Sequence, residues 1–264
     1  MPKEANDPRT NTVKATFALP VGGGFLHASA QVPAGRTTLT ELLPIVRNLE
    51  GAITGRIAEE AQAAGSPVSC KAGCAACCRQ MVPLNLFEAE ALMAWLQTLP
   101  EERRSELEGR FHRALSKLRD AGVIDKVLDP QWGREEGFAT GVAMAYFNAF
   151  VACPFLENEN CGIYSIRPLA CREYMVTSPP ELCQDPAKFD VAGVQLPVKL
   201  SHVLYAFGRQ MERDTRGWIP LVFLLAWGKS GLSPGDHVSG TGEEVLKEFL
   251  DQAAAVAKSE PGGS

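Results

Sequence analysis

The sequence lacks the features by which membrane, secreted and nucleic-acid-binding proteins are recognised. Its longest apolar run, at 219–227, is far shorter than the roughly 20 residues that a membrane helix needs. There is no long basic run, and the net charge is −5, whereas nucleic-acid binders usually carry a basic stripe. The polar start of the chain argues against a secretory signal. We therefore expect a cytoplasmic protein that binds neither nucleic acid nor a membrane.

Common catalytic signatures are also missing. The sequence contains no HExxH, no P-loop, no GxSxG and no GxGxxG preceded by a strand. A lone histidine is more often a surface or core residue than a ligand. No pair with metal-ligand spacing occurs among the four histidines, which are His27, His112, His202 and His237. The sequence thus identifies no catalytic residue and leaves open whether the protein is an enzyme.

The hydrophobic pattern predicts a mostly α-helical fold with a small N-terminal β-hairpin. Apolar and polar residues alternate over 13–19 and again over 26–32, on either side of a glycine turn at 22–24. Apolar residues recur at helical spacing in seven stretches, which are 38–64, 85–99, 100–119, 135–151, 200–211, 219–228 and 241–253. Residues 153–190 are expected to be loop-like, and 191–198 to form a short strand.

Two helix starts carry a capping box, in which a polar side chain and a glutamate three residues later bond to each other's backbone. These pairs are Asn85 with Glu88 and Thr241 with Glu244. The helix over 38–64 is expected to begin or bend near Pro44 and to end at Gly65.

The segments are expected to be arranged around a central metal-binding region. They are a disordered tail at 1–10, an N-terminal hairpin and helix at 11–66, a cysteine-cluster region at 67–190 whose metal-binding loops hang from helices, a C-terminal helical extension at 191–258 and a disordered tail at 259–264.

The most informative feature of the sequence is its eight cysteines, because packing alone rarely needs so many. Four form the string CKAGCAACC, and four follow at wider intervals: Cys70, Cys74, Cys77 and Cys78, then Cys153, Cys161, Cys171 and Cys183. In a reducing compartment, cysteines at such spacing are more often metal ligands than disulfides. Intervals of two or three residues suit a zinc ion or an iron–sulfur cluster.

Cys77 and Cys78 are adjacent, so their side chains diverge and rarely reach the same small tetrahedral ion. One of them is expected to serve a different metal, to bridge two metals or to remain free. Eight ligands divide naturally into two sets of four, and a single zinc ion with spare thiols is the alternative.

Basic residues flank both cysteine groups. Lys71 and Arg79 lie beside the first, and Arg167 and Arg172 lie beside Cys171. Four thiolates on a divalent ion carry a net charge of about −2, so nearby cations offset the burial of the site. These four residues are candidate second-sphere cations or, alternatively, ordinary surface residues. Pro168 is expected to start a short helix with Cys171 in its first turn.

The run CKAGCAACCRQMVPLNLFEAEAL, followed by CPFLENENCGIYSIRPLACREY, resembles the YkgJ-type CxxCxxCC family over residues 70–183. The resemblance implies a zinc- or iron-chelating role for the first seven cysteines, with Cys183 as an expected eighth ligand. It supplies no reaction and assigns no role to the hairpin or to the C-terminal helices.

Three functions follow. The leading hypothesis is a metal-binding protein whose metal is structural or carried. The second is an iron–sulfur enzyme acting with S-adenosylmethionine in methyl transfer or radical chemistry, since Cys70, Cys74 and Cys77 have the C-x3-C-x2-C spacing of radical enzymes. No repeated βα pattern supports the barrel of such an enzyme. The third is a thiol redox sensor that uses Cys77 and Cys78 as its switching pair.

Overall fold

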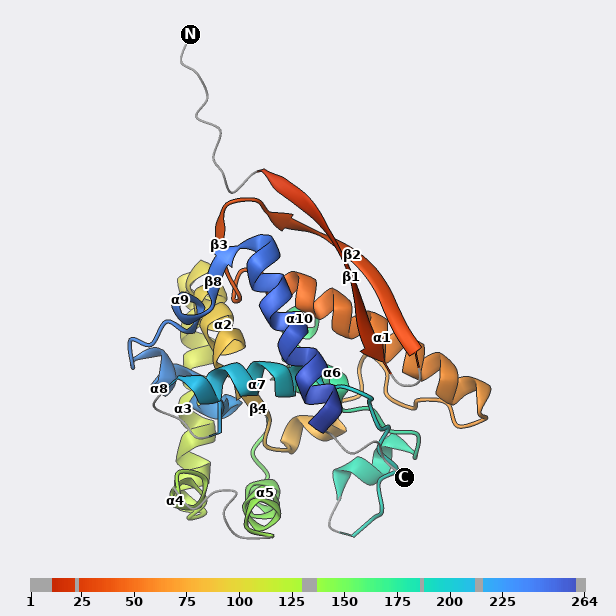
Figure 1. Ribbon diagram of the computed structural model, residues 1–264. Coiled ribbons are helices and arrows are strands. Elements are labelled where there is room, and N and C mark those ends of the chain that lie inside the picture. Colours follow the sequence, from red (N-terminus) through yellow and green to blue (C-terminus); the bar gives the residue numbers. More distant parts are fainter. Residues whose placement is uncertain (1–10, 22–23, 130–136, 186–187, 212–215, 260–264) are drawn as a thin grey trace.

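The computed structural model describes residues 11–21, 24–129, 137–185, 188–211 and 216–259, and the described part is mostly helical with an N-terminal hairpin, as predicted (Figure 1). The predicted tails and the centre of the glycine turn lie outside these residues. The α-helices are α1 (Leu43–Ala63), α2 (Leu86–Thr98), α3 (Glu101–Asp120), α4 (Ile124–Val127), α5 (Phe138–Asn148), α6 (Leu169–Glu173), α7 (Leu200–Gln210), α8 (Leu224–Gly228), α9 (Pro234–His237) and α10 (Gly242–Ser259). Single 3₁₀ turns are η1 (Ala76–Arg79), η2 (Tyr164–Ile166), η3 (Pro180–Gln184) and η4 (Leu221–Phe223).

The strands pair in twos, and every such pair in the described residues is antiparallel. The hairpin consists of β1 (Thr12–Val21) and β2 (Gly24–Pro33). Two short pairs join distant parts of the chain, β3 (Arg36–Thr38) with β8 (Ser239–Thr241) and β4 (Pro83–Asn85) with β7 (Trp218–Pro220). The last pair is β5 (Leu156–Glu157) with β6 (Asn160–Cys161). The β3–β8 pair joins the N-terminal segment to the C-terminal segment, and the β4–β7 pair joins the central region to the C-terminal segment.

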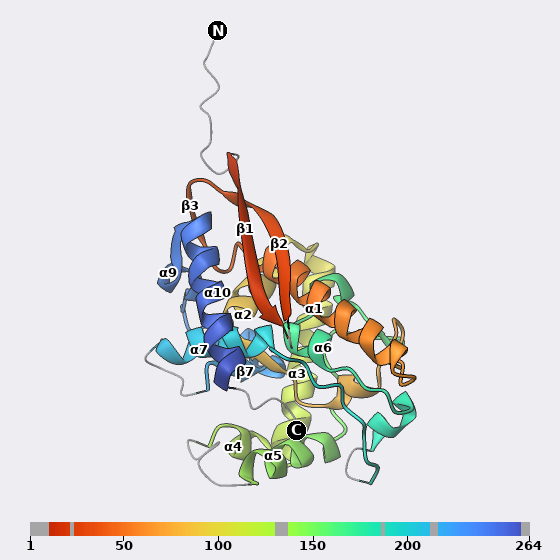
Figure 2. The same cartoon turned by 45° about the vertical axis from the view of Figure 1, so that its right-hand side comes forward.

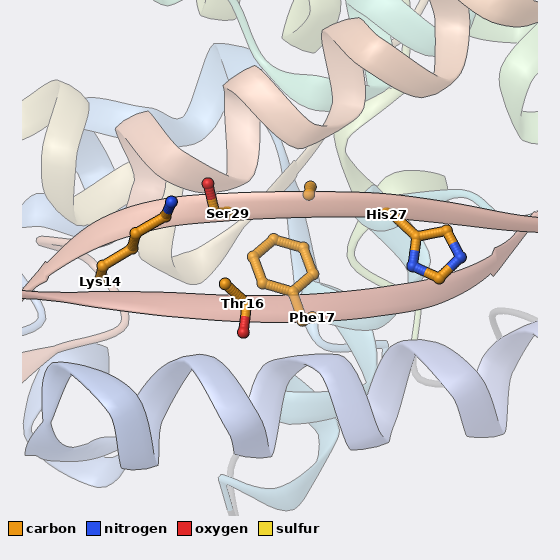
Figure 3. A pocket seen from close by; sticks show the side chains of 6 residues that line it. Lys14, Thr16, Phe17, His27 and Ser29 are labelled. Carbon is orange, nitrogen blue, oxygen red and sulfur yellow. The ribbon is translucent and has the colours of Figure 1, made fainter.

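The hairpin has one face on the core and one face in solvent. Leu19 and Val32 are buried against α10, whose contacts with β1 are visible in Figure 2. The opposite face carries Lys14 and His27 above a shallow hollow, shown in Figure 3, and no cysteine lines it. This alternation is the period-two pattern expected of a half-buried strand.

Three apolar clusters form the core, and each draws on the predicted helical stripes. The first unites the hairpin, α1, α7 and α10. The second joins α2 and α3 to Phe155 and Ile163, and the edge of the Phe111 ring packs on Phe155 at 5.3 Å between centroids. The third lies where the C-terminal end of α3 meets α4 and α5. Cys153 and Cys161 pack against the second cluster, so helical packing positions the cysteine segments.

The predicted helix boundaries hold where a specific cap is present. Pro44 stands in the first turn of α1, and Gly65 follows its end with φ of 78°. Thr241 and Glu244 form the reciprocal box, since the Thr241 N–H donates to Glu244 and the Glu244 N–H donates to Thr241. Asn85 caps α2 by accepting from the Glu88 N–H at 2.8 Å.

Several sequence expectations were wrong. No strand forms at 191–198, where only an isolated bridge joins Val176 to Gly193. The stretch 219–228 is divided between β7, η4 and α8 instead of one helix. The segment 153–190 is not one loop, since it contains β5, β6, η2, α6 and η3. The helix expected to reach Val151 ends at Asn148, and Phe150 is 70% exposed with φ of 50° instead of buried.

Candidate metal centre

The two cysteine groups, which are distant in sequence, meet through backbone and side-chain bonds. The Cys153 N–H donates to the Cys78 carbonyl oxygen at 2.7 Å. Arg79 forms a two-pronged ion pair with Glu159, with N···O distances of 2.7 and 3.1 Å. Because the Cys153–Cys78 bond is between main-chain atoms, it holds the groups together whatever the side chains carry.

The first group is a compact turn built from small residues. The Cys74 N–H donates to the Lys71 carbonyl and the Cys78 N–H donates to the Ala75 carbonyl, both at 3.0 Å. Gly73 adopts φ of 86°, a left-handed conformation that favours glycine. A Cβ there would lie 3.5 Å from the Asn160 side chain, an ordinary contact distance, so the backbone conformation and not the space favours glycine. The first group is therefore a turn held by its own backbone hydrogen bonds.

The second group is a tight hairpin followed by a short helix. Cys153 precedes β5 and Cys161 ends β6, and the turn between the strands uses Asn158 and Glu159 with φ of 49° and 58°. Cys171 lies in the first turn of α6, directly after Pro168 as predicted, although Pro168 caps this helix instead of being its first residue.

Four thiols from these segments lie close enough for their charges to interact. Burial raises the pKa of Cys153 to about 12, with Cys161 and Cys77 adding to the rise. Burial also raises the pKa of Cys171 well above its ordinary value, with Cys153 and Cys77 contributing. A hydrogen bond with Cys78, followed by burial, raises the pKa of Cys77. We call Cys77, Cys153, Cys161 and Cys171 the core-side set.

Two members of the core-side set, Cys153 and Cys161, have sulfurs that accept a backbone N–H hydrogen bond. The Phe155 N–H opposes the rise in the pKa of Cys153, and the Ile163 N–H does the same for Cys161. In both cases the donor is two residues after the cysteine. Backbone N–H groups directed at sulfur stabilise the thiolate and tune a bound metal from the second sphere. The hairpin thus presents two thiols already provided with donors.

The remaining thiols are grouped around the first turn. Burial raises the pKa of Cys70, and Cys77 and Cys74 raise it further. Burial likewise raises the pKa of Cys183, and Cys70, Cys77 and Cys74 add to the effect. We call Cys70, Cys74 and Cys183 the cavity-side set. Cys77 interacts with members of both sets and stands between them.

Comparison with known proteins agrees with this geometry. A family model described as "CxxCxxCC: Putative zinc- or iron-chelating domain" matches residues 69–190, a little under half of the chain. Residues 69–190 are therefore similar to this domain family. The resemblance expected from the cysteine strings is thereby confirmed. No curated protein and no solved structure gave a significant match.

One of the four predicted cations lies beside the thiols. Arg167 stacks on the Tyr164 ring at 4.3 Å and lowers the pKa values of Cys70, Cys77, Cys161 and Cys171 against the effect of burial. Its Nε is buried and, among the described residues, has no hydrogen-bond partner. A buried guanidinium nitrogen without a partner is costly, so this group suits a site that holds anionic thiolates.

The other three predicted cations are placed differently. Lys71 is exposed at the mouth of a cavity beside the first turn. Arg79 is committed to its ion pair with Glu159. Arg172 donates to the carbonyl oxygens of Arg167 and Ser165, at 3.2 and 2.7 Å. Arg172 therefore supports the backbone that carries Arg167.

Sequence reasoning missed several residues that position the cysteine segments. Ser69 bonds to the carbonyls of Val176 and Ser178, which brings the start of the first turn to the segment before Cys183. Glu50 on α1 lies 3.8 Å from Arg172 and is 2% exposed. The Gln80 amide donates to the Tyr174 hydroxyl at 3.5 Å. No sequence pattern marked Glu50, because its partner Arg172 lies in α6, which reaches α1 only through tertiary packing.

The donors of this region have the chemistry of a soft-metal site. All eight cysteines lie in the described residues, and all are free thiols. Within the described residues, no three Cys, His, Asp or Glu side chains are placed to hold one metal ion. Soft thiolates select zinc and iron–sulfur clusters, in accord with the family description. In the part of the chain that the structure describes, no helix is long and apolar enough to cross a bilayer.

Proposed function

We propose that this protein chelates a zinc ion or an iron–sulfur cluster through the core-side set, Cys77, Cys153, Cys161 and Cys171. The observation that carries this proposal is that three separate segments meet here: the Cys153 N–H bonds to the Cys78 carbonyl, and the Cys77 thiol lies near enough to interact with those of Cys153, Cys161 and Cys171. Four thiolates are the ligand number of a structural zinc site and of common iron–sulfur clusters.

The protein's own groups prepare this site for negative charge. The Phe155 and Ile163 N–H groups face two of the sulfurs, and Arg167 adds a positive charge. Without a metal, burial and mutual repulsion keep these thiols protonated, since each pKa is raised. Bound zinc would cross-link the segments, and a bound cluster would add redox or Lewis-acid chemistry.

The test is metal content after anaerobic purification. We expect stoichiometric zinc in colourless protein, or iron with acid-labile sulfide in brown protein, and a loss of that metal when Cys153→Ser and Cys161→Ser are combined. Protein that contains neither metal and cannot be reconstituted with either would refute the proposal. A double variant that keeps the wild-type metal content would exclude this ligand set.

No observation on the described residues favours the two alternative functions. The strand pairs there are antiparallel and two-stranded, whereas a radical S-adenosylmethionine enzyme needs a parallel barrel. Cys77 and Cys78 are free thiols and do not form a disulfide. A reducing compartment such as the cytoplasm is the setting we propose, since it maintains such thiols.

A further inference from the structure

The C-terminal half of α3 carries a row of cations along one edge of its buried stripe. Between residues 109 and 119 the sequence contains four Lys or Arg residues and neither aspartate nor glutamate. Three of these cations, Arg110, Arg113 and Lys117, each directly precede a buried residue of the stripe. Because the helix repeats about every 3.6 residues, the three follow one another along a single side of it. A protein with a net charge of −5 thus has a localised positive surface.

This row of cations borders a hollow of about 280 Å³ on the surface. The opposite wall is the segment that leads into the β5–β6 hairpin, and its lining residues carry no charge. Among the described residues, no acidic side chain lines the hollow, and the residues that line it besides the three cations are Ala114, Val151, Ala152, Cys153, Pro154 and Leu156. The hollow therefore combines an uncharged floor with a positive rim.

Two of the three cations have their charge available for a partner. Arg110 is committed to ion pairs with Glu106 and Glu157. Arg113 and Lys117 are exposed, and no ion pair within the described part of the chain involves either of them. Exposed, unpaired cations gathered at one hollow attract a negatively charged partner.

Phe150 presents an apolar ring beside this positive rim. It directly precedes the residues that line the hollow and is 70% exposed. Its φ of 50° is a left-handed conformation, which a bulky side chain rarely adopts. The ring packs on Phe147 at 6.4 Å between centroids, so it has a support on one side. An exposed aromatic ring on strained backbone is typical of a position that a partner covers.

We infer that Arg113, Lys117 and Phe150 form a docking surface around the hollow for an acidic segment of another protein, in which carboxylates flank an apolar side chain. The carboxylates complement the two unpaired cations, and the apolar side chain complements the ring and the uncharged floor. A nucleic-acid site would need a longer basic stripe than this one. Cys153 lines the hollow, so the docked segment would lie beside a cysteine of the core-side set. The inference does not depend on whether that set binds a metal.

The experiment is fluorescence anisotropy of a labelled peptide, EEELEEE, titrated with the full chain. We expect saturable binding that weakens at least about fivefold between about 50 and 300 mM salt, because exposed charges are screened. The uncharged peptide QQQLQQQ should bind at least about tenfold more weakly. Arg113→Glu/Lys117→Glu should lower the affinity for EEELEEE at least about tenfold, since attraction becomes repulsion. Phe150→Ser should lower it at least about threefold, because the apolar contact is lost.

The matched control makes the same change of charge elsewhere on the surface. Arg209→Glu/Lys258→Glu reverses one arginine and one lysine at exposed positions of α7 and α10, and it should bind EEELEEE like the wild type. Circular dichroism checks the fold of each variant. If Arg113→Glu/Lys117→Glu unfolds, Arg113→Ala/Lys117→Ala must show the loss of affinity in its place for the inference to stand.

Each other result has a definite meaning. The docking surface is overturned if EEELEEE does not bind saturably, or if the double variant and the matched control bind it equally well. Tighter binding of a single-stranded DNA of equal charge would also overturn it, because the partner would then be a nucleic acid. Metal content is measured on the same samples. Protein without metal that still binds the peptide would refute the proposed function alone, and protein with metal that does not bind it would refute the docking surface alone.

Discussion

The Cys153 N–H donates to the Cys78 carbonyl oxygen at 2.7 Å, and this bond joins the two cysteine groups. The acceptor is the backbone carbonyl of Cys78, so the Cys78 side chain takes no part in this bond. The thiol of Cys77, the neighbouring residue, instead interacts with members of both sets. We therefore expect different roles for these adjacent cysteines, with Cys77 as a metal ligand and Cys78 as a backbone acceptor.

This difference predicts opposite results for two neighbouring substitutions. Cys77→Ser should reduce the affinity for the core-side metal by at least about a hundredfold, because a thiolate ligand is lost. Cys78→Ser should change it by less than about threefold, since serine retains the carbonyl that Cys153 uses. Competition with a chromophoric chelator measures both affinities. Equal losses in the two variants would show that Cys78 is also a ligand.

Arg167 is predicted to support metal binding by its charge. Arg167→Gln removes the cation that interacts with four of the thiols, and we expect metal affinity to fall by about ten- to a hundredfold. Lys71→Gln, which removes an exposed cation at the cavity mouth, is the matched control and should have little effect. Equal metal affinity in the two variants would contradict a role for the Arg167 charge in metal binding.

Metal affinity is predicted to increase with pH. Burial and neighbouring thiols raise the pKa values of the core-side set above their ordinary values, so the metal-free thiols are protonated at neutral pH. Each thiol must release its proton to bind, and four of them give a slope of about four in log affinity against pH. Isothermal calorimetry in buffers of different ionisation enthalpy counts these protons. A slope near zero would mean that the ligands are already thiolates or are not cysteines.

The buried carboxyl group of Glu88 should make the folded protein less stable as the pH rises, which is opposite to ordinary acid denaturation. Burial raises its pKa to about 7 from an ordinary 4.5. Folding therefore favours the protonated form, and this stabilisation is complete below pH 4.5 and is lost as the pH rises through about 7. The loss amounts to about 3 kcal/mol in the free energy of unfolding.

The variant Glu88→Gln isolates this effect. It removes the titrating group and keeps an oxygen for the Leu169 N–H, which donates to Glu88 at 3.0 Å. Urea unfolding of the metal-free protein between about pH 5 and pH 8 should show a smaller decline in the variant than in the wild type. Glu173, whose pKa burial also raises to about 7, contributes a remaining decline of the same sign. Parallel curves would contradict the assignment to Glu88.

The sequence predicted what depends on local patterns and missed what depends on distant partners. Periodicity located the hairpin and most helices, and Asn85 marked the start of α2. The capping box at Glu88 was only half right, because its carboxylate accepts from Leu169 and from the Asn85 side chain instead of the Asn85 backbone. That choice depends on α6 packing against this residue, which spacing alone does not reveal.

The candidate site was predictable in its residue types but not in its partition. Cysteine count and spacing identified all the candidate metal ligands, because residue type and spacing can be read directly from the sequence. Their division into a core-side and a cavity-side set depends on the β5–β6 hairpin and on the Ser69 contacts, which are tertiary. The helix expected over 135–151 ends early for a similar reason, since the chain turns at Phe150 before Cys153 bonds to Cys78.

X-ray absorption at the edge of the bound metal tests the central claim most directly, because it reports which elements surround the metal. With metal bound only to the core-side set, we predict a first shell of about four sulfur atoms, at about 2.3 Å if the metal is zinc. An additional iron–iron shell would identify a cluster. A first shell dominated by nitrogen or oxygen would contradict the assignment of Cys77, Cys153, Cys161 and Cys171 as the ligands.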